Sequence, residues 1–347
     1  MDNILVIHPN WLGDVIFSTP FIRNLKRAYP DGAITSFVVP RTHPVLMNNP
    51  YIGEVILYDE DGAEASLGGK ASFVRELRGR QFETVFFLRP SLTRTALAVF
   101  AGIPERIGFD TSKSGWLLTR RISYPEEPVH RADMYLELLR QLGIAADGKG
   151  CDFFVTEREI ERARALLRDS GVAEGESFCV MHAGANWSLK RWPVASFARL
   201  ADRVADETGL QVIFTGAATD RIRTEEIIAR ATRRPVSLAG KTTLGEVGAL
   251  FTLSACMVSA DSGPMHIACA LGVPVVALFG PTHTDITGPY HPRHPNTVVL
   301  RNEIECNSEP CYDLDCPKNR CMEAIAVNDV LAAIKRLIKG GAASCNE

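Results

Sequence analysis

The sequence lacks any apolar run near the about 20 residues that a membrane-spanning helix needs. Its first residues show neither the basic segment nor the long apolar segment of a secretory signal. Basic residues are not in excess, because 38 Lys and Arg stand against 41 Asp and Glu, giving a formal net charge of -3. This balance argues against nucleic acid as the main partner. We therefore expect a cytoplasmic protein without a transmembrane segment, whose contact with a membrane would be peripheral.

Two common nucleotide-binding fingerprints are also missing. No G-x-G-x-x-G follows the first apolar run at residues 4–7, which weakens a dehydrogenase interpretation. In the stretch 235–242, Pro235 occupies the position where a P-loop needs its first glycine. The sequence thus argues against both a dinucleotide-dependent oxidoreductase and a P-loop NTPase.

Cysteine is present nine times, and eight of these positions fall into two groups. Cysteines in or beside apolar stretches are typical of reduced thiols that behave as small hydrophobes; these are Cys151, Cys179, Cys256 and Cys269. Four more recur every five residues near the end of the chain: Cys306, Cys311, Cys316 and Cys321. Their four-residue gaps lie at the edge of the range for zinc ligands, while a cytoplasmic location disfavours permanent disulfides. A structural zinc or iron site, redox-active pairs and free thiols in a loop all stay open.

A chain of 347 residues is longer than one ordinary core, so two domains are expected. Short apolar runs alternate with helical stretches, which is typical of an α/β fold with parallel sheets covered on both faces. The expected strands are 4–7, 34–39, 55–58, 84–88, 178–181, 211–215, 235–238, 256–259, 274–279 and 297–300. They divide into two doubly wound halves with a cleft between them.

The boundary falls near a charged amphipathic stretch at 157–167. We place the domains at 1–160 and 161–347. The last helical stretch, 327–338, has apolar residues at helical spacing and could pack back across the first domain.

A turn of small residues follows the strand at 256–259 and is the strongest candidate for an anion site. It contains Asp261, Ser262 and Gly263, followed by Pro264 at the start of an apolar helix. Backbone N–H groups at such a helix start could hold a diphosphate, with Asp261 accepting hydrogen bonds from a sugar or ribose. A simple capped helix is the alternative. His266 is either a ligand or a packed residue behind the turn.

Two further loops carry candidate residues. Lys190 and Arg191 precede a helix in the second domain, and Lys190 is the residue we expect to counter phosphate charge, although adjacent cations are often just solvated. In the first domain Gly13 and Asp14 follow the first strand, where Asp14 could cap a helix or take a proton from an incoming hydroxyl.

These segments together resemble one known family. The sequences Asn-Trp-Leu-Gly-Asp (10–14), Ala-Gly-Ile-Pro (101–104), Lys-Arg-Trp-Pro (190–193), Asp-Ser-Gly-Pro-Met-His (261–266) and Phe-Gly-Pro-Thr (279–282) are similar to the ADP-heptose:lipopolysaccharide heptosyltransferases of glycosyltransferase family nine. The resemblance spans nearly the whole chain. The first two segments look most like the heptosyltransferase II branch.

The resemblance implies a GT-B fold, in which two Rossmann-like domains bind the acceptor and the nucleotide sugar respectively. It implies inverting transfer of heptose from ADP-heptose to a heptosyl-Kdo-lipid A acceptor at the inner face of the inner membrane, with no cofactor required for catalysis. Asp14 would match the catalytic base, with Asn10 and Gly13 as acceptor-side candidates. Donor-binding candidates are Lys190, Asp261, Ser262, Gly263, His266, Gly240 and Thr215.

Several rivals remain at this point. The same fold could use another acceptor (Kdo-lipid A, outer core or protein) or another nucleotide sugar, and a nucleotide-sugar epimerase or a non-catalytic binding protein are weaker alternatives. Arginines of the first domain could meet acidic acceptor groups if they form one patch; these are Arg89, Arg94, Arg106, Arg120, Arg121 and Arg131. The sequence does not reveal the accepting sugar, the donor base or the oligomeric state.

Overall fold

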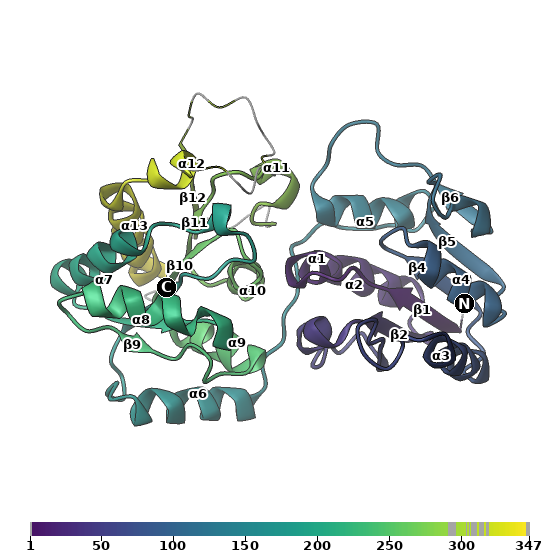
Figure 1. Ribbon diagram of the computed structural model, residues 1–347, viewed down its shortest axis with the longest axis horizontal. Coiled ribbons are helices and arrows are strands. Elements are labelled where there is room, and N and C mark those ends of the chain that lie inside the picture. The colour runs from purple at the N-terminus through teal and green to yellow at the C-terminus, as the bar shows by residue number, and fades with distance from the viewer. Residues whose placement is uncertain are drawn as a thin grey trace. The chain divides into compact units, whose positions relative to one another are not determined.

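A computed structural model describes residues 2–290, 296–302, 304, 306, 311, 316 and 319–344. The chain forms two compact units, Met1–Phe153 and Phe154–Glu347 (Figure 1). Among the described residues, no helix combines the length and the apolar character needed to cross a membrane.

The first unit is built on a parallel six-stranded sheet with the strand order β3-β2-β1-β4-β5-β6. The strands are β1 (Asn3–Ile7), β2 (Ala33–Val38), β3 (Glu54–Leu57), β4 (Thr84–Phe87), β5 (Glu105–Phe109) and β6 (Arg120–Ile122). This is the order of a Rossmann sheet, in which the topology switches between β1 and β4. The doubly wound fold expected for this half of the chain is confirmed.

Helices cover both faces of this sheet. They are α1 (Leu12–Phe17), α2 (Thr19–Ala28), α3 (Leu67–Gly79), α4 (Leu92–Phe100) and α5 (Arg131–Arg140), with short 3-10 helices η1 (Pro40–Val45) and η2 (Gly115–Leu117). Phe73 and Leu77 of α3 pack in one cluster with Leu5 and Phe37. On the other face Phe21 of α2 contacts Phe86 edge to face, with ring centroids 5.3 Å apart. Alternating residues of each strand thus face opposite layers, as parallel sheets require.

The second unit repeats the same topology in the order β12-β11-β10-β7-β8-β9. Its strands are β7 (Phe178–His182), β8 (Gln211–Thr215), β9 (Val236–Ser237), β10 (Cys256–Ala260), β11 (Val275–Leu278) and β12 (Thr297–Leu300). Its helices are α6 (Glu157–Asp169), α7 (Val194–Thr208), α8 (Arg221–Arg230), α9 (Leu244–Leu253), α10 (Gly263–Ala270), α11 (Thr284–Thr287), α12 (Arg320–Glu323) and α13 (Val327–Ser344), with η3 (Ser188–Lys190) and η4 (Ala218–Asp220). Here the topology switches between β7 and β10.

The helix α13 corrects one expectation. Its apolar face could have packed back across the first domain, but Val330 and Ile334 are fully buried in the core of the second unit. They lie in one cluster with Phe197 and Leu200 of α7. The helical spacing correctly indicated a buried stripe, whereas spacing alone could not say which core the stripe completes.

Two strands were missed at one edge of the first sheet. The strand β6 begins with Arg120 and Arg121, which are exposed, and only Ile122 is buried. Its neighbour β5 begins with the charged pair Glu105 and Arg106. Edge strands bury fewer side chains and tolerate charge, so they lack the continuous apolar signal of central strands.

Candidate active site

The candidate residues lie in loops that follow the carboxyl ends of strands, beside the switch point of each sheet. In the first unit Asp14 follows β1. In the second, Lys190 follows β7 and Asp261 follows β10, and these two strands are hydrogen-bonded neighbours. Open α/β sheets bind ligands at this edge because adjacent loops diverge there. Each sheet therefore carries one half-site, which we call the Asp14 half-site and the Asp261 half-site.

In the Asp14 half-site, the aspartate lies in the first turn of α1. Arg131, the first residue of α5, brings its Nε atom to 3.7 Å from Asp14 Oδ1, and about a quarter of the Asp14 side chain is exposed. Trp11 occupies the N-cap position without a side-chain capping bond. The carboxylate is thus held beside one cation and remains accessible to a ligand.

A buried tyrosine lies close to the same carboxylate. Burial raises the pKa of Tyr135 well above its ordinary value, and the charge of Asp14 raises it further, while Arg131 and Arg89 oppose this rise. All of these groups are therefore near enough to interact electrostatically. Arg131 therefore offers one positive charge beside Asp14.

Behind the loop of residues 8–14, buried polar groups fix the backbone. The fully buried His8 lies within hydrogen-bond distance of Ser18 Oγ (2.8 Å) and Ser36 Oγ (3.0 Å). Burial lowers the pKa of His8 to about 3, and the charge of Arg94 lowers it in the same direction. The imidazole is therefore neutral at physiological pH and acts as a structural bridge between α1 and β2.

Asn10 extends this support. Its Nδ2 atom donates to Glu60 Oε1 at 2.6 Å, and Arg94 contacts Glu60 and donates to the His8 carbonyl at 2.9 Å. The Oδ1 atom of Asn10 is buried with no hydrogen-bond partner in the described part of the chain. Asn10 thus orders the loop that ends at Asp14, and Gly13 stands half-buried beside it.

Several first-domain arginines have partners within the protein. Arg94 is buried and paired with Glu60, and the exposed Arg120 pairs with Glu105. Arg106 donates to the backbone carbonyls of residues 103, 104 and 117. Of the candidate arginines, Arg131 lies beside Asp14, and a common acidic-acceptor surface stays a prediction.

The Asp261 half-site is centred on a carboxylate with three partners. The Nζ atom of Lys190 donates to Asp261 Oδ2 at 2.6 Å, and Thr282 Oγ1 donates to the same oxygen at 2.7 Å. His266 Nε2 lies 3.5 Å from Oδ1. These residues come from the loops after β7, β10 and β11 and from α10, so four segments meet at one side chain.

The electrostatics of this cluster favour the ionised carboxylate. Burial by itself would raise the pKa of Asp261, but the hydrogen bond from His266 and the charge of Lys190 outweigh it and lower the pKa to about 2. The side chain of Asp261 is 5% exposed and that of Lys190 is 21% exposed. Asp261 therefore serves as a fixed internal anion that holds Lys190 at the mouth of the loop.

The start of α10 is open to a ligand. Ser262 occupies the N-cap position but makes no side-chain capping bond, and Pro264 stands in the first turn as expected. The Ser262 hydroxyl instead lies 2.9 Å from Ser259 Oγ. The alternative of a helix capped by its own serine therefore does not describe this turn, and the anion site at the N–H groups near Gly263 stays a prediction.

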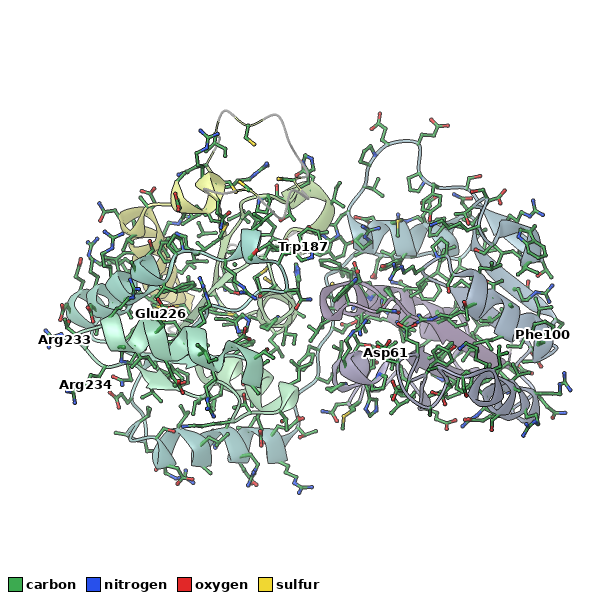
Figure 2. The ribbon with its side chains drawn as sticks, in the orientation of Figure 1. Asp61, Phe100, Trp187, Glu226, Arg233 and Arg234 are labelled. Carbon is green, nitrogen blue, oxygen red and sulfur yellow. The ribbon has the colours of Figure 1, made fainter. Side chains whose placement is uncertain are left out.

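The Lys190 loop is fixed from both sides. Lys190 Nζ lies 5.2 Å from the ring centroid of Trp187, which Figure 2 labels. Trp192 is fully buried, donates from Nε1 to the Ile325 carbonyl at 3.1 Å and contacts Phe197 edge to face. Trp192 therefore anchors this loop against α7.

Thr215 and Gly240, two further residues expected to bind the sugar nucleotide, follow or end the strands β8 and β9. The Oγ1 atom of Thr215 is buried and has no hydrogen-bond partner among the described residues. Gly240 has a φ of +73° and donates to the Gly216 carbonyl at 2.8 Å. A Cβ at this position would stand 3.1 Å from Ala218, so glycine suits both the left-handed backbone and the close approach.

The sequence did not predict the contacts of two residues at these sites. Thr282 lies in the motif at 279–282, directly after β11, and β11 is the neighbour of β10, which precedes Asp261. Arg131 was grouped with scattered arginines, although it begins the helix that reaches Asp14. Both links depend on strand order, which a single sequence does not display.

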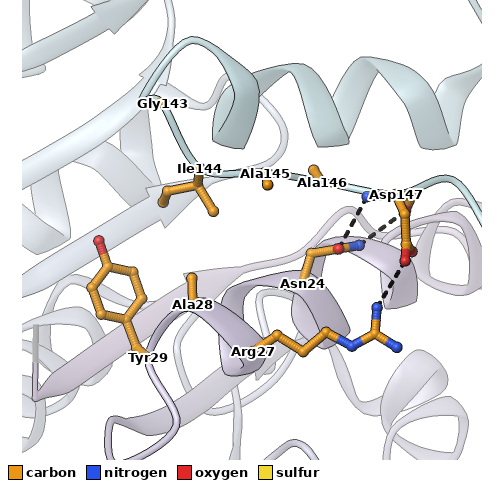
Figure 3. A pocket seen from close by; sticks show the side chains of 9 residues that line it. All are labelled: Asn24, Arg27, Ala28, Tyr29, Gly143, Ile144, Ala145, Ala146 and Asp147. Atoms are coloured by element: carbon orange, nitrogen blue, oxygen red, sulfur yellow. Dashed lines mark hydrogen bonds and ion pairs between the residues drawn. The ribbon is translucent and has the colours of Figure 1, made fainter.

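Each unit also contains a pocket outside the residues described so far. A pocket of about 670 Å³ in the first unit is lined by the end of α2 and by residues 143–147, where Asn24 and Arg27 bind Asp147 (Figure 3). The helix α2 ends just before β2 begins, so this pocket lies at the amino ends of the strands, opposite Asp14. In the second unit, a smaller pocket is lined by all four regularly spaced cysteines.

Two Rossmann-type sheets, one with a lysine held by an aspartate beside its switch point, are the arrangement of the GT-B class of glycosyltransferases. The family model of glycosyltransferase family 9 (heptosyltransferase) matches residues 70–317. The chain belongs to this family, as its motifs indicated.

Individual relatives agree with this assignment. Lipopolysaccharide heptosyltransferase 2 of Escherichia coli K12 is 30% identical over 299 residues, which cover 82% of this chain and 85% of the relative. A crystal structure of a family 9 glycosyl transferase from Veillonella parvula matches with a TM-score of 0.88 and 27% identity, covering 98% of each chain. The structure of E. coli ADP-heptose LPS heptosyltransferase II matches with a TM-score of 0.82 and 26% identity, covering 98% of this chain and 99% of that one.

Proposed function

We propose that the protein transfers heptose from ADP-heptose to a heptosyl-Kdo-lipid A acceptor in the inner core of lipopolysaccharide. The observation that carries the proposal is the cluster of Lys190, Thr282 and His266 around Asp261, beside the open start of α10. The 30% identical relative named as heptosyltransferase 2 supports the choice of sugar and acceptor.

In this proposal the second unit binds the donor. The N–H groups near Gly263 and the hydroxyl of Ser262 hold the diphosphate, and Lys190 adds a positive charge that Asp261 keeps in place. Thr215 and the backbone around Gly240 face the nucleoside. As the bond to ADP breaks, negative charge grows on the diphosphate, and these preorganised groups stabilise it without a bound cation.

The first unit supplies the base. Asp14 accepts the proton of the acceptor hydroxyl while that oxygen attacks the anomeric carbon from the face opposite ADP, so configuration inverts in one displacement. Arg131 lies beside Asp14, where it orients the carboxylate and offers positive charge to an acidic acceptor. Asn10 and Gly13 shape the loop on the acceptor side.

We further propose that the protein works at the cytoplasmic face of the inner membrane as a peripheral protein. The supporting observation is an exposed apolar edge near the Asp14 half-site, where Trp11 is 49% and Met47 58% exposed. The guanidinium of Arg41 lies 5.1 Å from the Trp11 ring centroid, which places positive charge beside it. Aromatic and basic side chains together suit an anionic lipid surface.

The decisive experiment incubates the protein with ADP-heptose and either heptosyl-Kdo-lipid A or Kdo-lipid A, and measures product mass. A gain of one heptose on the first acceptor alone is the expected result. Transfer only to Kdo-lipid A would show that the proposed acceptor is wrong, although the proposed heptose transfer is right. No transfer to either, with ADP bound normally, would refute the proposed reaction.

A further inference from the structure

The four regularly spaced cysteines near the end of the chain meet at one pocket of the second unit. The pocket has a volume of about 50 Å³, and its lining includes Cys306, Cys311, Cys316, Cys321, Gly280 and Pro281. None of the four forms a disulfide with another described cysteine. Four side chains of one soft ligand type thus line one small pocket.

The chemistry of the pocket suits a metal ion better than an organic ligand. Its volume exceeds the about 30 Å³ that one water occupies in the liquid, yet it is far smaller than a typical ligand pocket of about 300 Å³. The lining contains no carboxylate, and Arg320 is its one charged residue among the described lining. Four thiolates around a divalent ion form a common tetrahedral structural site.

One of the four thiols also contacts the loop after β11. The Cys321 thiol lies against the backbone of Gly280, because a Cβ at Gly280 would stand 3.0 Å from Cys321 Sγ. Sequence spacing alone gave no reason to expect such contact.

The backbone around the cysteines is already held in place. Asn319 adopts a left-handed conformation with φ of +36° just before α12, and its Oδ1 atom accepts from Cys321 Sγ at 3.6 Å. The N–H of Cys311 donates to the Pro281 carbonyl at 2.9 Å. As the side chains stand, no three ligating groups in the described part of the chain surround one point, so the thiols must turn toward the pocket to bind an ion.

We propose that Cys306, Cys311, Cys316 and Cys321 bind one tetrahedral divalent metal ion of the zinc or ferrous type. The ion would replace four separate thiols by one closed cross-link, and four thiolate ligands would complete its coordination, which fits a structural role.

Metal binding would also affect the loops that carry Lys190 and Thr282, and this second part of the proposal rests on the proposed function. The pocket wall also includes Leu189, which precedes Lys190, and Pro281, which precedes Thr282. Lys190 and Thr282 both donate to Asp261 Oδ2. In addition, Asn319 Nδ2 donates to the Arg191 carbonyl at 3.1 Å. Metal binding would therefore order both loops that complete the Asp261 half-site.

The test measures metal in the full-length protein purified without chelator. Elemental analysis is expected to find about one zinc or iron per chain. Replacement by Co²⁺ should give the visible bands of a tetrahedral thiolate site. The double variant C311S/C321S should lose the metal, while the control C151S, in the first unit, should keep it.

Two results would overturn the metal site. One is metal-free protein with all nine thiols titratable in denaturant. The other is metal-free protein with fewer than nine, which would indicate disulfides instead.

Calorimetry with ADP then tests the link to the donor loops. Chelation should weaken ADP binding about tenfold, and unchanged affinity after metal loss would refute the link. If metal is present but the intact protein binds no ADP, the metal site stands and the proposed function fails, so the two failures are distinguishable.

Discussion

The ion pair between Lys190 and Asp261 gives the sharpest test of the candidate site. We consider Lys190→Met, Asp261→Asn and the double variant. The two charged atoms are 2.6 Å apart, and at an effective dielectric constant of about 20 their attraction is about 6 kcal/mol. Desolvation of the buried carboxylate opposes this attraction, so the net value is smaller.

The two single variants should differ because the two partners differ in exposure. Lys190→Met leaves a 5% exposed carboxylate with only Thr282 and His266, and we expect a loss of about 3 kcal/mol in the free energy of unfolding. Asp261→Asn leaves Lys190, which is 21% exposed and can turn toward water, so about 2 kcal/mol is expected. The double variant should be less destabilised than their sum by about 2 kcal/mol.

Urea unfolding measures these free energies, and calorimetry with ADP measures the site. Both single variants should bind ADP about tenfold to a hundredfold more weakly, because a charged hydrogen bond contributes about 1.5–3 kcal/mol. The exposed pair of Arg221 and Glu225 in α8 is a control whose coupling should stay below about 0.5 kcal/mol. Additive effects of Lys190→Met and Asp261→Asn would refute the reasoning.

Three further predictions concern other parts of the molecule. Asp14→Asn should lower kcat about a hundredfold or more while calorimetric ADP affinity stays normal, and near-normal turnover would remove Asp14 from the base role. His8 has a folded pKa of about 3, below its unfolded value, so its stabilising effect is complete above about pH 6.5 and falls as pH drops toward 3. Thermal unfolding should show a loss of roughly 2 kcal/mol between pH 7 and pH 5 that His8→Gln reduces, and an equal slope in both proteins would contradict this. Trp192→Ala should cost about 4 kcal/mol in urea unfolding, because a fully buried indole and its hydrogen bond are lost, whereas a cost below about 1 kcal/mol would show that the loop is anchored elsewhere.

Central parts of the fold could be predicted because their strands are buried on both faces. The runs at 4–7 and 256–259 are continuous and apolar, and both lie in the middle of their sheets. The edge strand β6 has two exposed arginines and left no comparable signal. For α13, the spacing of apolar residues predicted which face is buried. It could not predict which of the two units that face packs against.

The candidate site was predictable wherever a residue lies in a loop directly after an apolar strand. Asp14, Lys190 and Asp261 were found in this way, and their roles in catalysis and donor binding stay predictions. The contact of Thr282 with Asp261 joins residues 21 positions apart. The contact forms because β10 and β11 are parallel neighbours in the sheet. In the sequence a whole helix, α10, separates the two strands, so their pairing is not visible there.

The matching strand orders of the two units have an evolutionary consequence. The contact-based boundary between them falls at one point in the chain, after Phe153, and each unit has its own complete sheet. Recombination at this point would exchange one half without cutting a sheet or a core. Under the function proposed above, chimeras joined there would pair one relative's acceptor preference with another's nucleotide sugar.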